Sequence, residues 1–252
     1  MSRVALVTGG AKRIGRAICL ELAAQGYDIL IHYRDSYAEA KETRLACLAA
    51  GAKTVNFIAC DLSESRGRAM LISSALSLAG KLDLLVNNAS LFAYDSASTF
   101  TPGSLEQHLQ TNYLAPVELS MALFQQCSQR GQKSHVVTLL DQKIHNLNTD
   151  YVSYTLAKLA SHSSIRYLAQ CCAPVLRVNA VAPGVSLISG KMKEHDFSRA
   201  HKMAALGQSN SPGDIAAAIL MLDKSPAITG QTLTVDGGQH LLPRGRDVAY
   251  QE

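Results

Sequence analysis

The sequence lacks the marks of several protein classes. Its 252 residues include six cysteines but no C-x-x-C pair, and its eight histidines follow no H-x-x-x-H or mixed Cys/His spacing. These absences argue against a metal site and favour reduced, buried thiols in a cytoplasmic protein. No apolar run approaches the roughly 20 residues of a membrane span. A strand expected from Arg3 leaves no room for a signal peptide.

The sequence also has little charge and no break in its composition. Charged residues make up 17% of the chain, and the formal net charge is +4 with both signs interspersed. This falls short of the clustered positive charge of a nucleic-acid-binding surface, although it suits an anionic small molecule. No Pro/Gly/Ser-rich linker or low-complexity tract divides the chain, so a single domain over residues 1–252 is expected.

Short apolar, β-branched runs alternate with amphipathic segments of helical length. Strands are expected at Val4–Thr8, Asp28–Tyr33, Thr54–Cys60, Leu82–Asn87, His135–Leu140, Leu176–Ala180 and Gln231–Val235. Helices are expected at Arg13–Gln25, Tyr37–Ala50, Gly67–Ala79, Leu105–Gln129, Val152–Cys171 and Gly213–Leu222. This alternation predicts an α/β fold, a doubly wound Rossmann domain with a seven-stranded parallel sheet and helices on both faces. The polar, weakly periodic segment 186–210 is expected to be a substrate lid loop.

A glycine-rich turn follows the first expected strand and leads into a helix. Its sequence is Thr8-Gly9-Gly10-Ala11-Lys12-Arg13-Ile14-Gly15. Glycines there permit a tight turn and let backbone N–H groups approach a pyrophosphate at the positive end of the helix dipole. Asp61 follows the third strand and Asn87–Ser90 end the fourth, at the edge where such sheets bind ligands. This arrangement predicts a dinucleotide-binding site.

The second expected strand ends in Tyr33-Arg34-Asp35. A carboxylate at this place suits the ribose hydroxyls of NAD, whereas a cation suits the 2′-phosphate of NADP. Because Arg34 comes first and Lys12 and Arg13 add positive charge, NADP is favoured. The alternative is that Arg34 is a solvated surface charge paired with Asp35.

Tyr154 and Lys158 lie four residues apart in an expected helix and so share one face. A cation held there stabilises tyrosinate, so that a phenol with an ordinary pKa of about 10 can donate or accept a proton near neutral pH. Tyr37 and Lys41 repeat the spacing in the helix after the second strand, where a solvated surface pair is expected. Asp141 precedes Tyr154 by thirteen residues.

These residues make the chain similar to short-chain dehydrogenases/reductases over essentially its whole length. The shared positions are the Thr8–Gly15 turn, Asp61, Asn87–Ala89, Asn112, Tyr154 with Lys158, Asn179, Pro183-Gly184 and Val235–Gly238. Two departures narrow the resemblance: Arg13 replaces the middle glycine of the turn, and Asp141 replaces the serine of the active site. Both are typical of pteridine reductases and of the related bacterial dihydromonapterin reductases.

The resemblance implies NADPH-dependent reduction of dihydropterins or dihydrofolate by hydride transfer. Its implied catalytic residues are Tyr154, Lys158, Asp141 and Asn112. Tyr154 would be the proton donor, with its pKa lowered by Lys158, and Asn112 would anchor a water that connects Lys158 to solvent. Asp141 would accept from substrate N–H groups or pass a proton through Tyr154. The resemblance also implies a homotetramer formed through the helices expected at Leu105–Gln129 and Val152–Cys171.

Two further sets of residues complete the implied site. The cofactor-binding set is Gly9, Lys12, Arg13, Ile14, Gly15, Tyr33, Arg34, Asp61, Leu62, Asn88, Ala89, Ser90, Pro183 and Gly184, and the substrate-binding set is Arg13, Ser90, Phe92, Asp141, Tyr154 and Gly184. Phe92 would stack on the pterin, and the Arg13 guanidinium would reach both pyrophosphate and pterin. Each has a simpler alternative: Arg13 as a phosphate clamp only, Phe92 in the core, and Ser90 and Asp141 as loop caps. If the turn requires positive φ at Arg13, a non-glycine residue costs about 1–2 kcal/mol.

Two other functions stay open beside a pterin reductase: a carbonyl reductase of the 3-oxoacyl type, and a catalytically silent NADP-binding sensor. Asp141 argues against the first, because an ionised carboxylate cannot donate to a ketone oxygen as negative charge builds there. The intact Tyr154, Lys158 and Asn112 argue against the second. The expected partner is a small pterin or folate, with no nucleic acid and no membrane.

Overall fold

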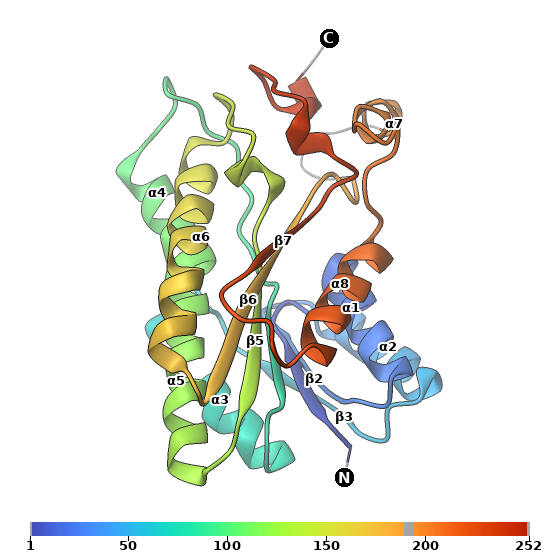
Figure 1. Cartoon of the computed structure of the whole chain (residues 1–252), viewed down its shortest axis with the longest axis vertical. Coiled ribbons are helices and arrows are strands. Elements are labelled where there is room, and N and C mark those ends of the chain that lie inside the picture. Colours follow the sequence, from blue (N-terminus) through green and yellow to red (C-terminus); the bar gives the residue numbers. More distant parts are fainter. Residues whose placement is uncertain (1, 189–193, 251–252) are drawn as a thin grey trace.

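The computed structural model describes residues 2–188 and 194–250, and within them seven strands form one parallel sheet (Figure 1). The strands are β1 (Val4–Val7), β2 (Asp28–Tyr33), β3 (Val55–Ala59), β4 (Leu84–Asn87), β5 (Ser134–Leu139), β6 (Leu176–Pro183) and β7 (Thr232–Val235). Their order is β3-β2-β1-β4-β5-β6-β7, so the direction of winding reverses between β1 and β4. The predicted fold class is confirmed, and this reversal marks the place where such sheets bind ligands.

Helices cover both faces of the sheet. They are α1 (Arg13–Ala24), α2 (Tyr37–Ala50), α3 (Ser65–Ala79), α4 (Pro102–Leu109), α5 (Ala115–Arg130), α6 (Val152–Cys172), α7 (Glu194–Lys202) and α8 (Pro212–Lys224). In Figure 1, α1, α2 and α8 lie on one side and α3, α5 and α6 on the other. Alternate residues of β1 serve the two cores: Val4 and Leu6 pack into one, and Ala5 and Val7 into the other. None of the described helices is long and apolar enough to cross a membrane.

The helix expected over Leu105–Gln129 is divided in the structure. α4 begins at Pro102, and its N-cap is Thr101, whose hydroxyl accepts from the backbone N–H of Ser104. A π-helical turn, η1 (Gln110–Leu114), then separates α4 from α5 and carries Asn112. Hydrophobic periodicity does not reveal a single π-turn, because it shifts the apolar stripe by only one residue. Such turns are frequent at functional sites.

The segment expected to be a substrate lid, 186–210, is helical in part. α7 occupies Glu194–Lys202, whereas residues 189–193 of the expected lid lie outside the described residues. Arg13 Nη2 donates to the backbone oxygen of Ile188 at 2.7 Å, which joins the glycine-rich turn to this segment. The role of the segment as a lid stays a proposal.

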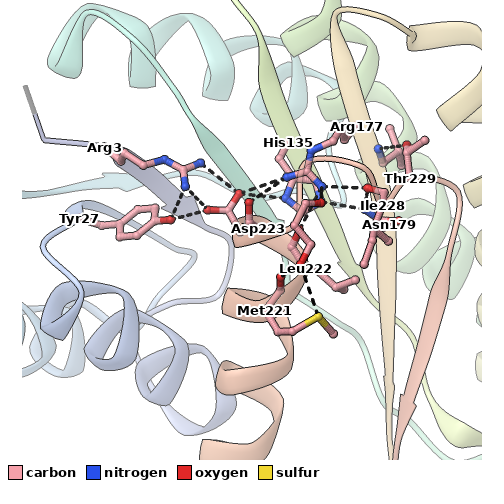
Figure 2. A network of polar contacts seen from close by, with 12 residues as sticks. Arg3, Tyr27, His135, Arg177, Asn179, Met221, Leu222, Asp223, Ile228 and Thr229 are labelled. Atoms are coloured by element: carbon pink, nitrogen blue, oxygen red, sulfur yellow. Dashed lines mark hydrogen bonds and ion pairs between the residues drawn. The ribbon is translucent and has the colours of Figure 1, made fainter.

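A buried polar network lies at the end of the sheet where the strands begin, opposite their carboxyl ends (Figure 2). Asp223, near the end of α8, accepts hydrogen bonds from Tyr27 Oη and from Arg3 Nη2. His135 Nδ1 donates to Asp223 at 3.0 Å, while its Nε2 accepts from Asn179 Nδ2 at 3.0 Å. Burial alone would raise the pKa of Asp223, but these donors and the Arg3 charge hold it below its usual value. The network therefore stabilises the fold at the amino ends of the strands, away from the carboxyl ends where such sheets bind ligands.

Replacing Asp223 by Asn should destabilise the fold by about 3 kcal/mol at neutral pH, because Arg3 and Tyr27 lose a buried anionic partner. Because the folded-state pKa is lowered, the contribution of Asp223 is complete above its unfolded pKa of about 3.9 and is lost as the pH falls through the folded value. Denaturant unfolding should therefore show the difference from wild type shrinking in acid. The control Glu39→Gln removes an exposed carboxylate 4.0 Å from Lys12 and should cost less than about 0.5 kcal/mol. Equal losses in both variants would contradict the prediction.

Candidate active site

A cavity of about 840 Å³ opens at the carboxyl ends of the strands. The residues predicted from sequence that line it are Gly9, Lys12, Arg13, Ile14, Gly15, Tyr33, Arg34, Asp61, Leu62, Asn88, Ala89, Ser90, Phe92, Asp141, Tyr154 and Gly184. Lys158, Asn112 and Pro183 are buried behind this lining. The fold thus gathers into one cavity residues that the sequence spreads from Gly9 to Gly184.

The turn after β1 requires glycine at two of its positions, Gly9 and Gly15. Gly9 has φ +61°, and a Cβ at Gly15 would lie 2.1 Å from the Gly9 oxygen and 2.7 Å from the Asn88 side-chain nitrogen. Lys12, the N-cap residue of α1, contributes no side-chain cap within the described structure. The first turn of α1 therefore lines the cavity with backbone N–H groups that its cap leaves free for a ligand. This arrangement fits a pyrophosphate group.

Arg13 carries the backbone strain that its place in the turn suggested. Its φ is +56°, in the left-handed region, which costs a non-glycine residue about 1–2 kcal/mol. The hydrogen bond from its guanidinium to the oxygen of Ile188 is a compensating contact. Arg13 therefore lines the cavity and joins the glycine-rich turn to the segment after β6; a contact with both pyrophosphate and pterin stays a prediction.

His32 is a lining residue that the sequence analysis missed. The Gly9 N–H donates to His32 Nδ1 at 3.1 Å, and Nε2 donates to the oxygen of Cys60 at 3.1 Å. Burial lowers the pKa of His32 to about 4, so the ring is neutral at physiological pH. The histidine joins the ends of β1, β2 and β3 beneath the glycine-rich turn. A single histidine in an apolar strand gives no signal of this role.

The cavity continues past β2 and β3 to Arg34 and Asp61. Arg34 Nε lies 2.6 Å from Asp35 Oδ2, and the two side chains are 63% and 76% exposed. Arg34 is paired with Asp35, as the simpler interpretation expects, and it also lines the cavity; binding of a 2′-phosphate by Arg34 stays a prediction. Asp61 Oδ1 accepts from the Ser63 backbone and hydroxyl at 2.8 and 2.7 Å, which fixes the orientation of the carboxylate.

Asp141 and Tyr154 share a hydrogen bond inside the cavity. Tyr154 Oη donates to Asp141 Oδ2 at 2.8 Å, and Asp141 Oδ1 accepts from the Lys143 backbone N–H at 2.8 Å. Asp141 caps the 3-10 turn η2 (Gln142–Ile144), as the simpler alternative expects, and it also contacts the tyrosine; its role toward substrate or in proton transfer stays a prediction. Burial raises the pKa of Asp141, although the Lys143 N–H and charge oppose the rise.

The tyrosine pKa departs from the expectation. Burial, and after it the Asp141 carboxylate, raise the pKa of Tyr154 well above its ordinary value, whereas the sequence predicted that Lys158 would lower it. Lys158 Nζ donates to the oxygen of Leu139 at 2.7 Å and lies 5.6 Å from the centre of the Tyr154 ring. Burial lowers the pKa of Lys158 itself to about 8. A phenol with a raised pKa stays protonated at neutral pH, so the free site holds the proton, but it is a weaker acid than one whose pKa lies near the working pH.

Asn112 holds the loop after β4. Its Oδ1 accepts from the Leu91 N–H at 2.8 Å and from Ser90 Oγ at 3.1 Å, and its Nδ2 donates to the Leu91 oxygen at 2.8 Å. The π-turn η1 points this side chain at the loop that carries Ser90 and Phe92. The expected water between Asn112 and Lys158 stays a prediction.

Aromatic rings form one wall of the cavity. Phe92 stacks on Tyr151 with ring centres 4.3 Å apart, and it meets Tyr154 edge-on at 4.7 Å. Tyr151, which the sequence analysis missed, has φ +59° and is the N-cap residue of α6. Phe92 is 37% exposed, so it is not a core residue. Its stacking on a flat substrate stays a prediction.

The end of the chain supplies lining residues that sequence reasoning also missed. Asp247 and Val248 line the cavity, and Asp247 Oδ2 lies 2.5 Å from Lys143 Nζ. Arg246 makes a two-point contact with Asp150, from Nε to Oδ2 at 2.8 Å and from Nη2 to Oδ1 at 3.0 Å. This part of the sequence has neither a periodic pattern nor a motif, so nothing local placed it at the site.

Comparisons with known proteins agree with the fold and with an oxidoreductase. A family model described as enoyl-(acyl carrier protein) reductase matches residues 9–240. A solved structure, FolM alternative dihydrofolate reductase 1 from Brucella canis complexed with NADP, superposes with a TM-score of 0.87 at 33% identity, covering 95% of each chain.

Two curated relatives are named for different activities. Pteridine reductase 1 of Leishmania tarentolae is 31% identical, over 94% of this chain and 96% of its own. The granaticin polyketide synthase putative ketoacyl reductase 2 of Streptomyces violaceoruber is 29% identical, over 95% of this chain and 96% of its own. Because these identities are so similar, the choice between the two reactions rests on the residues of the site.

Proposed function

The chain belongs to the short-chain dehydrogenase/reductase family, and we propose that it is an NADPH-dependent reductase that converts dihydropterins or dihydrofolate to their tetrahydro forms. The observation that carries the proposal is the 2.8 Å hydrogen bond between Tyr154 and Asp141. It joins the proposed proton donor to a carboxylate, where ketone-reducing relatives of this family place a hydroxyl. The likeness to FolM and to pteridine reductase 1 supports the same reaction.

The shape of the cavity supports a dinucleotide cofactor. Its lining runs without a break from Arg34 and Asp61, past the glycine-rich turn, to Asp141 and Tyr154. Arg34 supports NADPH over NADH, as does the NADP in the Brucella canis structure. Bound NADPH supplies the hydride that reduces the C=N bond.

The residues of this chain supply the proton and the orientation. The phenolic O–H of Tyr154, which points at Asp141 in the free protein, turns to the ring nitrogen when substrate binds and transfers its proton there. The tyrosinate that remains regains a proton through Asp141 or Lys158. The remaining acceptor capacity of Asp141 meets N–H groups on the aminopyrimidine edge of the pterin. Phe92 packs against the flat ring, a stacking contact worth about 0.5–1.5 kcal/mol beyond its buried area.

The oxoacyl alternative fits the site less well. Ketone reduction builds negative charge on an oxygen, and a buried carboxylate beside that oxygen repels it. Reduction of a protonated imine leaves a neutral amine, which Asp141 tolerates. The sensor alternative would leave the Asp141–Tyr154 hydrogen bond and the buried Lys158 without a use.

One assay separates the three functions. Nicotinamide oxidation by the purified protein is followed with NADPH or NADH against dihydrobiopterin, dihydromonapterin, dihydrofolate and an acetoacetyl thioester. The proposal predicts turnover of at least one pterin or folate and none of the thioester. Turnover of the thioester alone would overturn it, and nucleotide binding without any turnover would favour the sensor.

Replacing Arg34 by Ala should raise the KM for NADPH by about 10-fold to 100-fold, the loss of one charge-assisted contact to phosphate. The KM for NADH should change little, because NADH has no 2′-phosphate. Asp35→Asn is the matched control: it releases Arg34 from its 2.6 Å partner and should keep or lower the KM for NADPH. A loss that is equal for both nucleotides would show that Arg34 does not read the phosphate.

We also propose that the single domain over residues 1–252 assembles as a cytoplasmic homotetramer through α5 and α6. Leu156 and Tyr167 on α6 are 45% and 67% exposed, which is unusual for large apolar side chains and supports a helix-face contact. Light scattering on the purified protein tests the assembly. A monomer at assay concentrations would contradict it.

A further inference from the structure

Lys143 has an unusual environment for a lysine. Its side chain is 2% exposed, and it is among the largest fully buried side chains in the described structure. An ammonium group this deeply enclosed needs a counter-charge. That charge comes from Asp247, 104 residues later in the chain, at 2.5 Å. Both residues line the same cavity as Asp141 and Tyr154.

The C-terminal segment, residues 246–250, is fixed at two further places beside the site. Asp150 accepts from the Arg246 guanidinium and from the Asp247 N–H at 2.8 Å. The Tyr250 ring lies 5.1 Å from Tyr94 and 6.1 Å from Tyr151, centre to centre. The Lys143–Asp247 contact is therefore the point where the docked C-terminal segment enters the cavity.

Lys143 also lies beside the Asp141–Tyr154 hydrogen bond. Its backbone N–H donates to Asp141 Oδ1, and its ammonium lies 5.2 Å from the centre of the Tyr151 ring. Burial raises the pKa of both Asp141 and Tyr154; the positive charge of Lys143 opposes the rise at Asp141, and the negative charge of Asp247 adds to the rise at Tyr154, after burial and Asp141. The ion pair thus places two opposite charges beside one hydrogen bond.

We propose that Lys143 and Asp247 are positioning residues that couple docking of the C-terminal segment to the Asp141–Tyr154 hydrogen bond. When the segment is docked, Asp247 balances Lys143 and completes the cavity wall. When it is released, the ammonium acts on Asp141 without that counter-charge and the wall opens. The inference rests on the proposed function, because it assigns the Asp141–Tyr154 hydrogen bond to proton transfer.

The sign of the effect follows from the charges around the pair. The groups that act on Asp141 and Tyr154 are Lys143, Lys158, Tyr151 and Asp247. Asp141 and Tyr154 share a proton and titrate as a unit. Loss of the Lys143 cation should raise the apparent pKa of this unit, and loss of the Asp247 anion should lower it.

The first test is the pH dependence of kcat/KM for the dihydropterin that the wild type turns over. Lys143→Met should move the profile to higher pH and Asp247→Asn to lower pH, each by about one unit. The double variant should return close to the wild-type profile. If the two residues had a purely structural role, both variants would lose activity without moving their pH profiles in opposite directions. Profiles that move in the same direction, or that do not move, would therefore overturn the proposal.

A second test does not depend on turnover. Amide hydrogen exchange of residues 246–250, measured without substrate, should become faster in Lys143→Met. It should stay as in wild type in Lys133→Met, which removes an exposed lysine outside the site. Unchanged exchange in Lys143→Met would overturn the coupling whatever the substrate. If the wild type reduces no pterin but exchange responds to Lys143, the proposed function fails while the docking contact stands.

Discussion

Replacing Tyr154 by Phe should lower kcat for dihydropterin reduction by about 10²–10⁴-fold, the usual contribution of a positioned general acid. The substitution removes only the hydroxyl that donates to Asp141 Oδ2 at 2.8 Å. The ring, which meets Phe92 edge-on at 4.7 Å, keeps its packing. The effect should therefore fall on the chemical step and leave the fold and nucleotide binding unchanged.

The measurement compares kcat, KM and nucleotide affinity for wild type and Tyr154→Phe. Tyr37→Phe is the matched control, because Tyr37 also precedes a lysine by four residues in a helix, α2, but its side chain is 51% exposed. It should retain wild-type kcat. If Tyr154→Phe kept more than about a tenth of wild-type kcat, the loss would be smaller than a general acid usually contributes. Another group would then have to deliver the proton.

Replacing Asp141 by Ser should lower kcat/KM for the dihydropterin by about 100-fold, because it removes a buried carboxylate that is hydrogen-bonded to Tyr154 and that we propose also binds substrate N–H groups. Serine is the informative choice because it can still cap η2, as Asp141 does through the Lys143 N–H, so folding should be preserved. It also restores the hydroxyl that ketone-reducing members of the family carry at this place.

Three readouts decide the outcome for Asp141→Ser. Pterin turnover should fall, NADPH affinity should stay within about twofold because Asp141 makes no charge pair with phosphate, and the melting temperature should change little. Turnover of the acetoacetyl thioester, which the proposal predicts to be absent in wild type, should become detectable. Unchanged pterin reduction would reduce Asp141 to a loop cap and would remove the main argument against the oxoacyl alternative.

Much of the site could be predicted because its determinants are local in sequence. The turn at Gly9 and Gly15 follows from backbone sterics, and a Cβ at Gly15 would indeed lie 2.1 Å from a backbone oxygen. Tyr154 and Lys158 share a helix face by spacing alone. Strain at Arg13 followed from the rule that only glycine adopts positive φ freely.

Other features depend on groups that are distant along the chain. His32 joins three strand ends, and Asp247 meets Lys143 only because the C-terminal segment folds back over the cavity. The pKa of Tyr154 was predicted with the wrong sign, since the spacing to Lys158 was visible but the burial and the Asp141 carboxylate beside the phenol were not. Desolvation is a property of the packed molecule.

The sequence by itself determined the α/β architecture, the glycine-rich turn and the pairing of Tyr154 with Lys158 on one helix face, because strand and helix periods and turn sterics act over a few residues. Only the tertiary structure decided the protonation of that pair, the aromatic wall of Phe92 and Tyr151, and the buried Lys143–Asp247 contact. These depend on how much water each group loses and on which charges meet after folding, and both are set by residues far apart in the chain.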